Sequence, residues 1–400
     1  MLSDKDQILY EKCLAAENEF KEDWKTIVNI DSPTGYGEGL TKVAYCVIDK
    51  LKSIGAEVKI YPISNKDEGF NVVGSIEGNG KGSILLLAHM DTVQPLGSAA
   101  KRPFRIDNEG KAYGPGVSDC KSGVVQCLHA LKILQVNGFK NFSRITFMAN
   151  CQEENGSKDS SEIIKELAKK HDYVLCAETG VPGDGICVNR VGSGNLYTYV
   201  KGKTSHAAYP WLCLNAADEL AHQVLRINQL ADNEKGTVIT TRIIESGTAN
   251  KKSNVVPDYA VGIKRVYAYT PEELNRVETA AAEFAKDTLI SGTEVTNKLN
   301  MHFPPFVKSK KTIALANLAR DIYADLGLNL KSESGAAATD AGWASSVNDA
   351  ALCSLGPVSG GKNHTDEEWA DANTVVPRLY LLTRMLIELG SRGLEQNNDD

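Results

Sequence analysis

The stretch Ile84-Leu85-Leu86-Leu87-Ala88-His89-Met90-Asp91 places a run of apolar residues directly before a histidine and an aspartate. A strand that is apolar at every position is typical of a central strand buried on both faces of a sheet. Residues at the carboxyl end of such a strand lie at the edge where parallel α/β sheets bind their ligands. The stretch therefore predicts a buried central strand with a polar site at its end.

The segments around this stretch alternate between strand-like and helix-like patterns. The expected helices are residues 9–28, 40–54, 122–136, 160–169 and 375–389, and the expected strands are 58–63, 71–76, 83–88, 144–149 and 173–177. Such alternation predicts a mostly parallel sheet flanked by helices.

The glycine-rich segment Gly78-Asn79-Gly80-Lys81-Gly82-Ser83 superficially resembles a phosphate-binding loop. It precedes a strand instead of opening a helix, and it lacks the P-loop spacing. We interpret it as a hairpin turn between the two flanking strands.

The pattern changes after about Val191. The expected strands are 196–200, 237–244 and 260–267, and the expected helices are 216–227 and one that begins at Pro271. A β-α-β-β-α-β order of this kind predicts a small α+β sandwich inserted into the larger α/β domain. We assign residues 1–191 and 304–400 to the larger domain and residues 192–303 to the inserted one.

Composition excludes several classes of protein. The formal net charge of −7 argues against a nucleic-acid or membrane-surface binder, because both need clustered lysine and arginine. The N-terminus lacks the basic start and apolar run of a signal peptide, and no apolar run approaches the roughly 20 residues of a membrane span. The nine cysteines form no CxxC pair. We expect a cytoplasmic protein with reduced thiols, no membrane partner and no nucleic-acid partner.

Acidic and imidazole side chains follow three of the predicted strands. They are His89 with Asp91, the pair Glu153 and Glu154, and Glu178. Each alone also fits a solvated or structural residue, but three such strand ends at one edge predict a shared site. Adjacent side chains diverge, so Glu154 can ligate a metal while Glu153 takes a proton from water. Asp91 is spaced to hydrogen-bond the imidazole of His89 and orient its metal-binding nitrogen.

Three loops offer further candidates. Asp119 precedes a predicted helix, where it is either the N-cap or a carboxylate directed at a metal. His206 lies near a turn, a position usually structural. His364 lies in the polar loop 362–368 and can provide one more imidazole.

These segments resemble the di-zinc family that includes glutamate carboxypeptidase, aminoacylase, succinyl-diaminopimelate desuccinylase and peptidase T. The resemblance covers residues 29–389 in order. The motifs that carry it are His89-Met90-Asp91, Gly114-Pro115-Gly116-Val117-Ser118-Asp119-Cys120-Lys121, Glu153-Glu154-Asn155-Gly156-Ser157, Gly202-Lys203-Thr204-Ser205-His206-Ala207 and the late His364. The likeness is greatest to the glutamate carboxypeptidase branch, through Ala112-Tyr113-Gly114-Pro115-Gly116, Ser253-Asn254-Val255-Val256-Pro257 and Pro377-Arg378-Leu379-Tyr380.

The resemblance implies a centre of two zinc ions, with cobalt or manganese as alternatives. Asp119 would bridge both metals. His89 and Glu178 would complete one site, and Glu154 and His364 would complete the other.

The resemblance also implies roles for residues around the metals. Asp91 would orient its neighbouring imidazole, and Glu153 would be the general base. His206 would stabilise the tetrahedral oxyanion from an inserted lid and dimerisation domain, in this family often across a homodimer. Asn254 and Arg265 would bind substrate.

The implied function is zinc-dependent hydrolysis of an amide next to a free carboxylate, in a small peptide or an N-acyl amino acid. The alternatives are an N-acyl-amino-acid deacylase acting on acetyl or succinyl groups, a dipeptidase, and a non-catalytic binding relative. Cys120 follows the bridging aspartate where relatives often have a second aspartate, and it is compatible with the cis peptide bond often found there. We do not expect Cys120 to be a ligand, because the ligand set is already full. Met301-His302-Phe303 lacks an arginine that would clamp a substrate carboxylate, so the released residue need not be glutamate.

Overall fold

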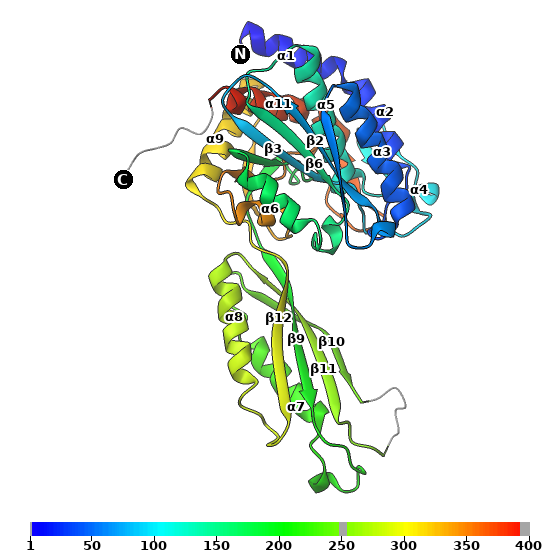
Figure 1. Ribbon diagram of the computed structural model, residues 1–400, viewed down its shortest axis with the longest axis vertical. Helices are drawn as coiled ribbons and strands as arrows, with labels where there is room; N and C mark the ends of the chain where they lie inside the picture. The colour runs from blue at the N-terminus through cyan, green and yellow to red at the C-terminus, as the bar shows by residue number, and fades with distance from the viewer. Residues whose placement is uncertain (1, 248–253, 393–400) are drawn as a thin grey trace. The chain divides into compact units, whose positions relative to one another are not determined.

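The computed structural model describes residues 2–247 and 254–392, which form two compact units (Figure 1). The described residues of the larger unit lie within Met1–Asn189, Lys308–Gly335 and Thr339–Asp400, and those of the smaller unit lie within Arg190–Val307 and Ala336–Ala338. In this part of the chain, no helix combines the length and apolar character that crossing a membrane requires.

The larger unit is built on a sheet of six strands. In spatial order they are β1 (Glu57–Pro62), β2 (Phe70–Glu77), β6 (Arg144–Asn150), β3 (Ser83–His89), β7 (Tyr173–Cys176) and β14 (Ala351–Leu352). Strands β6, β3, β7 and β14 are parallel, whereas β1 and β2 are antiparallel to their neighbours. Strand β3 lies in the middle of the sheet, and its residues 84–88 are all apolar and buried, as the sequence predicts.

The predicted hairpin at residues 78–83 is wrong, because β6 lies between β2 and β3. The backbone N–H groups of Gly78 and Gly80 instead donate to the carbonyls of Ser143 and Phe142, at 3.0 and 2.8 Å. A Cβ atom on Gly80 would lie 2.3 Å from the carbonyl carbon of Asn141. The glycines therefore allow two backbone segments to approach closely.

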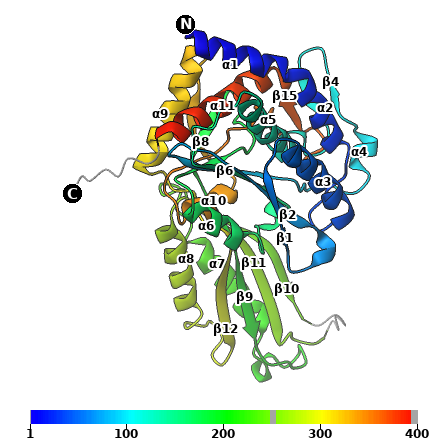
Figure 2. The same cartoon turned by 45° about the horizontal axis from the view of Figure 1, so that its top comes forward.

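Helices cover both faces of this sheet, and Figures 1 and 2 show α5 and α11 on one face and α6 on the other. The helices of this unit are α1 (Asp4–Ala15), α2 (Glu17–Val28), α3 (Gly37–Ser53), α4 (Ser98–Lys101), α5 (Ser122–Val136), α6 (Ser161–Lys169), α9 (Lys310–Asp325), α10 (Asp340–Ser345) and α11 (Val375–Arg392). Helix α3 packs on β1 and β2, α5 and α11 pack on β3, and α10 packs on β7 and β14. The single helix expected over 9–28 is two helices separated at Ala16, because α1 packs on α11 whereas α2 packs on α5.

Two short strands absent from the prediction, β5 (Lys111–Tyr113) and β15 (Trp369–Asp371), bring two distant loops together. Further short strands that the sequence did not predict are β4 (Arg105–Ile106), which pairs with β5, and β8 (Gly185–Arg190) and β13 (Lys331–Gly335), which pair with each other. Strand β15 pairs antiparallel with β5, with Trp369 opposite Tyr113. The loop that follows β5 and the loop that precedes β15 are therefore neighbours, and they contain Asp119 and His364.

The smaller unit is an antiparallel sheet with two helices. Its elements are β9 (Gly192–Lys201), α7 (Ala216–Asn228), β10 (Val238–Ser246), β11 (Tyr259–Ala268), α8 (Pro271–Phe284) and β12 (Glu294–Phe303), and the strand order is β10-β11-β9-β12. This is the predicted β-α-β-β-α-β order. Alternation along β9 buries Leu196 under the helices and leaves Tyr197 on the opposite face.

Candidate metal centre

His89 ends β3 and is almost completely buried. Its Nδ1 atom lies 3.0 Å from the backbone carbonyl oxygen of Asp91 and 3.3 Å from an oxygen of the Asp91 carboxylate. Because these oxygens only accept hydrogen bonds, Nδ1 carries a proton and donates it. The other ring nitrogen, Nε2, is then the unprotonated atom that faces the site and can accept a metal ion.

The carboxylate of Asp91 ties together two neighbouring strand ends. It accepts hydrogen bonds from the backbone N–H groups of Glu153 and Glu154, at 3.1 and 3.0 Å. The hydroxyl of Thr34 donates to the same carboxylate at 2.7 Å. The turn after β6 is thereby anchored to the end of β3, and this anchor positions both glutamates.

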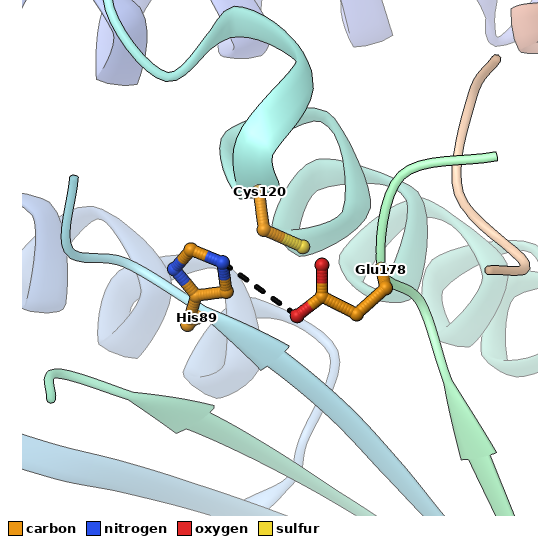
Figure 3. Close-up of side chains that lie close together, drawn as sticks. All are labelled: His89, Cys120 and Glu178. Carbon is orange, nitrogen blue, oxygen red and sulfur yellow. Dashed lines mark ion pairs between the residues drawn. The ribbon is translucent and has the colours of Figure 1, made fainter. Parts of the chain in front are cut away.

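Asp119 lies between two imidazoles. Its Oδ1 atom is 3.1 Å from Nε2 of His89, and its Oδ2 atom is 3.1 Å from Nε2 of His364. Each imidazole has a second carboxylate nearby: Glu178 lies 3.6 Å from His89, and Glu154 lies 3.2 Å from His364. The structure thus brings together all the side chains predicted as ligands, in two halves that share one carboxylate. Figure 3 shows one half, with His89 and Glu178 facing each other from the ends of β3 and β7.

The loop that carries Asp119 does not cap the helix that follows it, which was one of the two interpretations of this aspartate. Helix α5 begins at Ser122 without a side-chain cap, so the N-cap interpretation of Asp119 is wrong. The peptide bond between Asp119 and Cys120 is cis, which the family resemblance allows. Gly123 serves close packing, because a Cβ atom there would lie 1.8 Å from the carbonyl oxygen of Ala177.

Glu368, which the sequence analysis did not single out, holds this loop. Its carboxylate accepts the backbone N–H groups of Gly116, Ser118 and Asp119, at 3.2, 2.9 and 3.0 Å. The side chain is buried, and burial raises the pKa of Glu368 to about 7. The only sequence signal is an acidic residue close to His364, and adjacent acids are usually solvated.

A second missed carboxylate, Asp340 at the start of α10, holds the turn after β6. It accepts the side-chain amide of Asn150 at 2.7 Å, and it also accepts the hydroxyl of Ser157. Asn150 is the last residue of β6, and Ser157 follows the Glu153-Glu154 pair. Asp340 therefore helps to fix both ends of the turn that carries these glutamates.

The charges of the site are strongly coupled. Burial opposes the ionisation of His89, but nearby carboxylates, above all Glu178, raise its pKa well above its ordinary value. Hydrogen bonds to Asp119 and Glu154 raise the pKa of His364 to about 10. Burial also opposes the ionisation of Asp119, but hydrogen bonds from both imidazoles lower its pKa. The two imidazoles therefore carry the positive charge that balances these carboxylates.

The residues present fit metal ions. Oε1 of Glu154 is buried and has no hydrogen-bond partner among the residues that the structure describes. One ligand atom from each of His89, Asp119 and Glu154 lies within 4.8 Å of the other two. Imidazole and carboxylate ligands suit zinc, and a cation here would satisfy the unpaired oxygen.

Glu153 points into the same site. Its carboxylate lies 4.0 Å from Nε2 of His89 and is buried. Burial raises the pKa of Glu153 well above its ordinary value. A carboxylate with a raised pKa is suited to accept a proton and then return it.

The remaining predicted residues lie in the smaller unit. The backbone N–H of Ala208 donates to Nδ1 of His206 at 3.1 Å, so the proton of the neutral ring is on Nε2. The side-chain amide nitrogen of Asn254 lies 3.3 Å from that Nε2 atom. Both atoms carry hydrogen in this tautomer, so the two predicted residues lie side by side without a hydrogen bond between these atoms. Ser253 of the same motif lies outside the described residues. Arg265 lies on β11, well beyond Asn254 in the chain, and donates to Ser193 at 2.9 Å. It does not join His206 and Asn254.

Comparison with known proteins identifies the family. The model of peptidase family M20/M25/M40 matches residues 85–388. The chain belongs to this family. It is a hydrolase, and the peptidases of the M20 family depend on metal ions.

Individual members agree with this assignment. The M20-family chain is 30% identical to carboxypeptidase G2 of Pseudomonas sp. strain RS-16 over 391 residues, which cover 97% of this chain and 93% of that protein. It is 28% identical to succinyl-diaminopimelate desuccinylase of Rickettsia canadensis over 226 residues, 52% of this chain and 58% of the relative. The aminopeptidase PepT of Bacillus cereus has the same fold, with a TM-score of 0.74, 19% identity, and coverage of 95% of this chain and 98% of that one.

Proposed function

We propose that this M20-family hydrolase cleaves an amide bond next to a free carboxylate at a centre of two metal ions. The observation that carries the proposal is the position of Asp119, whose two oxygens each lie 3.1 Å from a different imidazole. A carboxylate shared in this way is suited to bridge two cations. The likeness of this chain to carboxypeptidase G2 over nearly its whole length supports an amide next to a free carboxylate as the class of substrate.

The ligands divide into two sets. His89 and Glu178 would hold one ion, and Glu154 and His364 would hold the other, with Asp119 shared. Zinc suits these ligands best, with cobalt and manganese as alternatives. When bound, two such ions polarise the scissile carbonyl and lower the pKa of water toward neutrality.

Glu153 is the proposed general base. It takes a proton from the attacking water and returns it to the leaving nitrogen, which avoids expulsion of an unstable amide anion. Asp91 positions this base through the hydrogen bond that it accepts from the backbone N–H of Glu153. The same aspartate also orients His89, so one residue aligns the base and a ligand.

Three residues of the smaller unit are proposed to act on the substrate. His206 presents Nε2–H as a donor for the tetrahedral oxyanion, and Asn254 lies beside it. Arg265 is proposed to bind a substrate carboxylate. We further propose that residues 192–303 act as a lid and dimerisation domain in a homodimer.

A second candidate is an N-acyl-amino-acid deacylase, such as one that removes a succinyl group. It is favoured by the likeness to succinyl-diaminopimelate desuccinylase, which spans about half of the chain. A dipeptidase would use the same chemistry with a different pocket. A non-catalytic relative is disfavoured, because the sequence retains Glu153 and each proposed ligand.

Metal content and hydrolysis test the proposal together. The purified protein is analysed by mass spectrometry for bound metal and assayed on N-acyl amino acids, dipeptides and peptides with a C-terminal glutamate. We expect two metal equivalents and release of an amino acid that stops on chelation and returns with zinc. Binding of a single equivalent with full activity would refute the dinuclear centre. Activity only on amides without a free carboxylate would refute the substrate class.

A further inference from the structure

The thiol of Cys120 faces the half of the centre that contains His89 and Glu178. One ligand atom from each of these three residues lies within 4.8 Å of the other two. All three side chains are buried. Figure 3 shows the sulfur directed toward the space beside the imidazole and the carboxylate.

The local contacts hold the sulfur at this position. Cys120 directly follows Asp119, so one short segment supplies two donor atoms to the same half. The Sγ atom donates a weak hydrogen bond, 3.3 Å long, to the backbone carbonyl of Ala177. Ala177 directly precedes Glu178. The sulfur is therefore anchored beside a proposed ligand by a bond that is easily exchanged.

Against the expectation from the sequence, we propose that Cys120 is a further, thiolate ligand of the ion at the His89–Glu178 half of the centre. The proposal rests on the metal centre of the proposed function and makes its two halves chemically unequal. One half then offers nitrogen, oxygen and sulfur, whereas the half with Glu154 and His364 offers nitrogen and oxygen only. On binding, the Sγ–H proton leaves to solvent and the sulfur lone pair forms the bond to the cation.

The sulfur makes the two halves prefer different ions, because only one half contains it. Thiolate ligands favour zinc and cadmium, whereas carboxylate sites also accept manganese and magnesium. The Cys120 half is also closed, since its side chains are buried, whereas His364 of the other half is about half exposed, at 52%. The Cys120 half therefore fills first and loses its ion last during chelation.

The competing interpretation is that Cys120 is an ordinary core thiol. Its hydrogen bond to Ala177 would then persist in the loaded protein, and the metal would have only nitrogen and oxygen neighbours. Cys127 is the matched control, because it is equally buried, lies on α5, and has a pKa raised by burial alone.

Cobalt titration separates these interpretations. Metal-depleted protein is titrated with Co²⁺, and the sulfur-to-cobalt charge-transfer band is followed in the near ultraviolet. We expect wild type and Cys127→Ser to develop the band within the first equivalent. Cys120→Ser should bind cobalt without the band, and its preference for Cd²⁺ over Mn²⁺ should fall by at least about 10-fold. A band of equal intensity in Cys120→Ser would overturn the proposal.

X-ray absorption at the zinc edge needs no variant. Wild-type protein with one equivalent of zinc should show a sulfur neighbour at about 2.3 Å. A first shell of nitrogen and oxygen only, in a protein that binds two equivalents and hydrolyses substrate, would overturn this inference and leave the proposed function intact. Failure to bind metal at all would overturn both.

Discussion

The Oε1 atom of Glu368 accepts a hydrogen bond from the backbone N–H of Asp119 at 3.0 Å, across 249 residues of sequence. The pairing of β15 with β5 makes this contact possible. Glu368 thereby holds the loop of the proposed bridging ligand by its backbone.

Replacement of Glu368 by glutamine should weaken metal binding by about 10–100-fold while the chain still folds. The new NH₂ group would face a backbone N–H donor of the Asp119 loop, so at least one of the three hydrogen bonds is lost. Titration against a chromophoric chelator measures the affinity. The control is Glu367→Gln, since Glu367 is exposed and pairs with Lys362; equal losses in both variants would contradict the positioning role.

Replacement of Glu153 by glutamine should lower turnover by about 10²–10⁴ and leave two metal equivalents bound, because the amide cannot take the water proton. Glu154→Gln should reduce metal content instead, because Glu154 is a proposed ligand. Turnover and metal content are measured on the same preparations. A Glu153→Gln enzyme with near wild-type turnover would refute the general-base role.

Replacement of His206 by alanine should lower kcat by about 10²–10³, the usual effect of removing one oxyanion donor. The side chain is exposed, so the thermal midpoint should change little. Steady-state kinetics and a melting curve are compared with those of His222→Ala, an alteration on α7 of the same unit. An unfolded His206→Ala protein would favour the structural interpretation of this histidine.

Lys264 predicts a pH dependence of stability. It is buried in the smaller unit, where it donates to Asn228 and Thr241, and burial lowers its pKa to about 8. Between pH 8 and its ordinary pKa of 10.5, the unfolded chain binds a proton that the folded chain lacks, so this lysine makes stability rise with pH. The thermal midpoint of wild type relative to Lys264→Met should therefore increase between about pH 7 and about pH 10. The control is Lys298→Met, which alters an exposed lysine of β12. The thermal midpoint of wild type relative to this variant should not change over the same pH range.

Replacement of Gly123 by alanine should cost at least about 1–3 kcal/mol of unfolding free energy, because its Cβ would overlap the carbonyl oxygen of Ala177. The strain falls between the start of α5 and the residue before Glu178. Metal affinity should therefore fall together with stability in chemical denaturation and chelator titration. An alanine variant as stable as wild type would show that α5 can move freely from this strand end.

The buried strands and most helices of both units were predictable because their apolar periodicity is local. The apolar residues 84–88 of β3 and the start of α5 at Ser122 are examples. The predicted hairpin at residues 78–83 was wrong, because β2 pairs with the distant strand β6 and not with β3, and local pattern does not decide a pairing between distant strands. Helix 9–28 was predicted as continuous because its division at Ala16 follows from packing against two different helices.

The sequence by itself determined which side chains are candidates to ligate a metal or accept a proton, since His89 and Glu153 stand out by residue type and by position after strands, and Asp119 by its motif before a helix. Tertiary structure alone decided which acids support them. Glu368 and Asp340 look like ordinary surface acids in the sequence, and only the pairing of β15 with β5 and the packing of α10 bury them. The physical reason is that a carboxylate acquires such a role through hydrogen bonds and burial, and both depend on contacts between residues far apart in the chain.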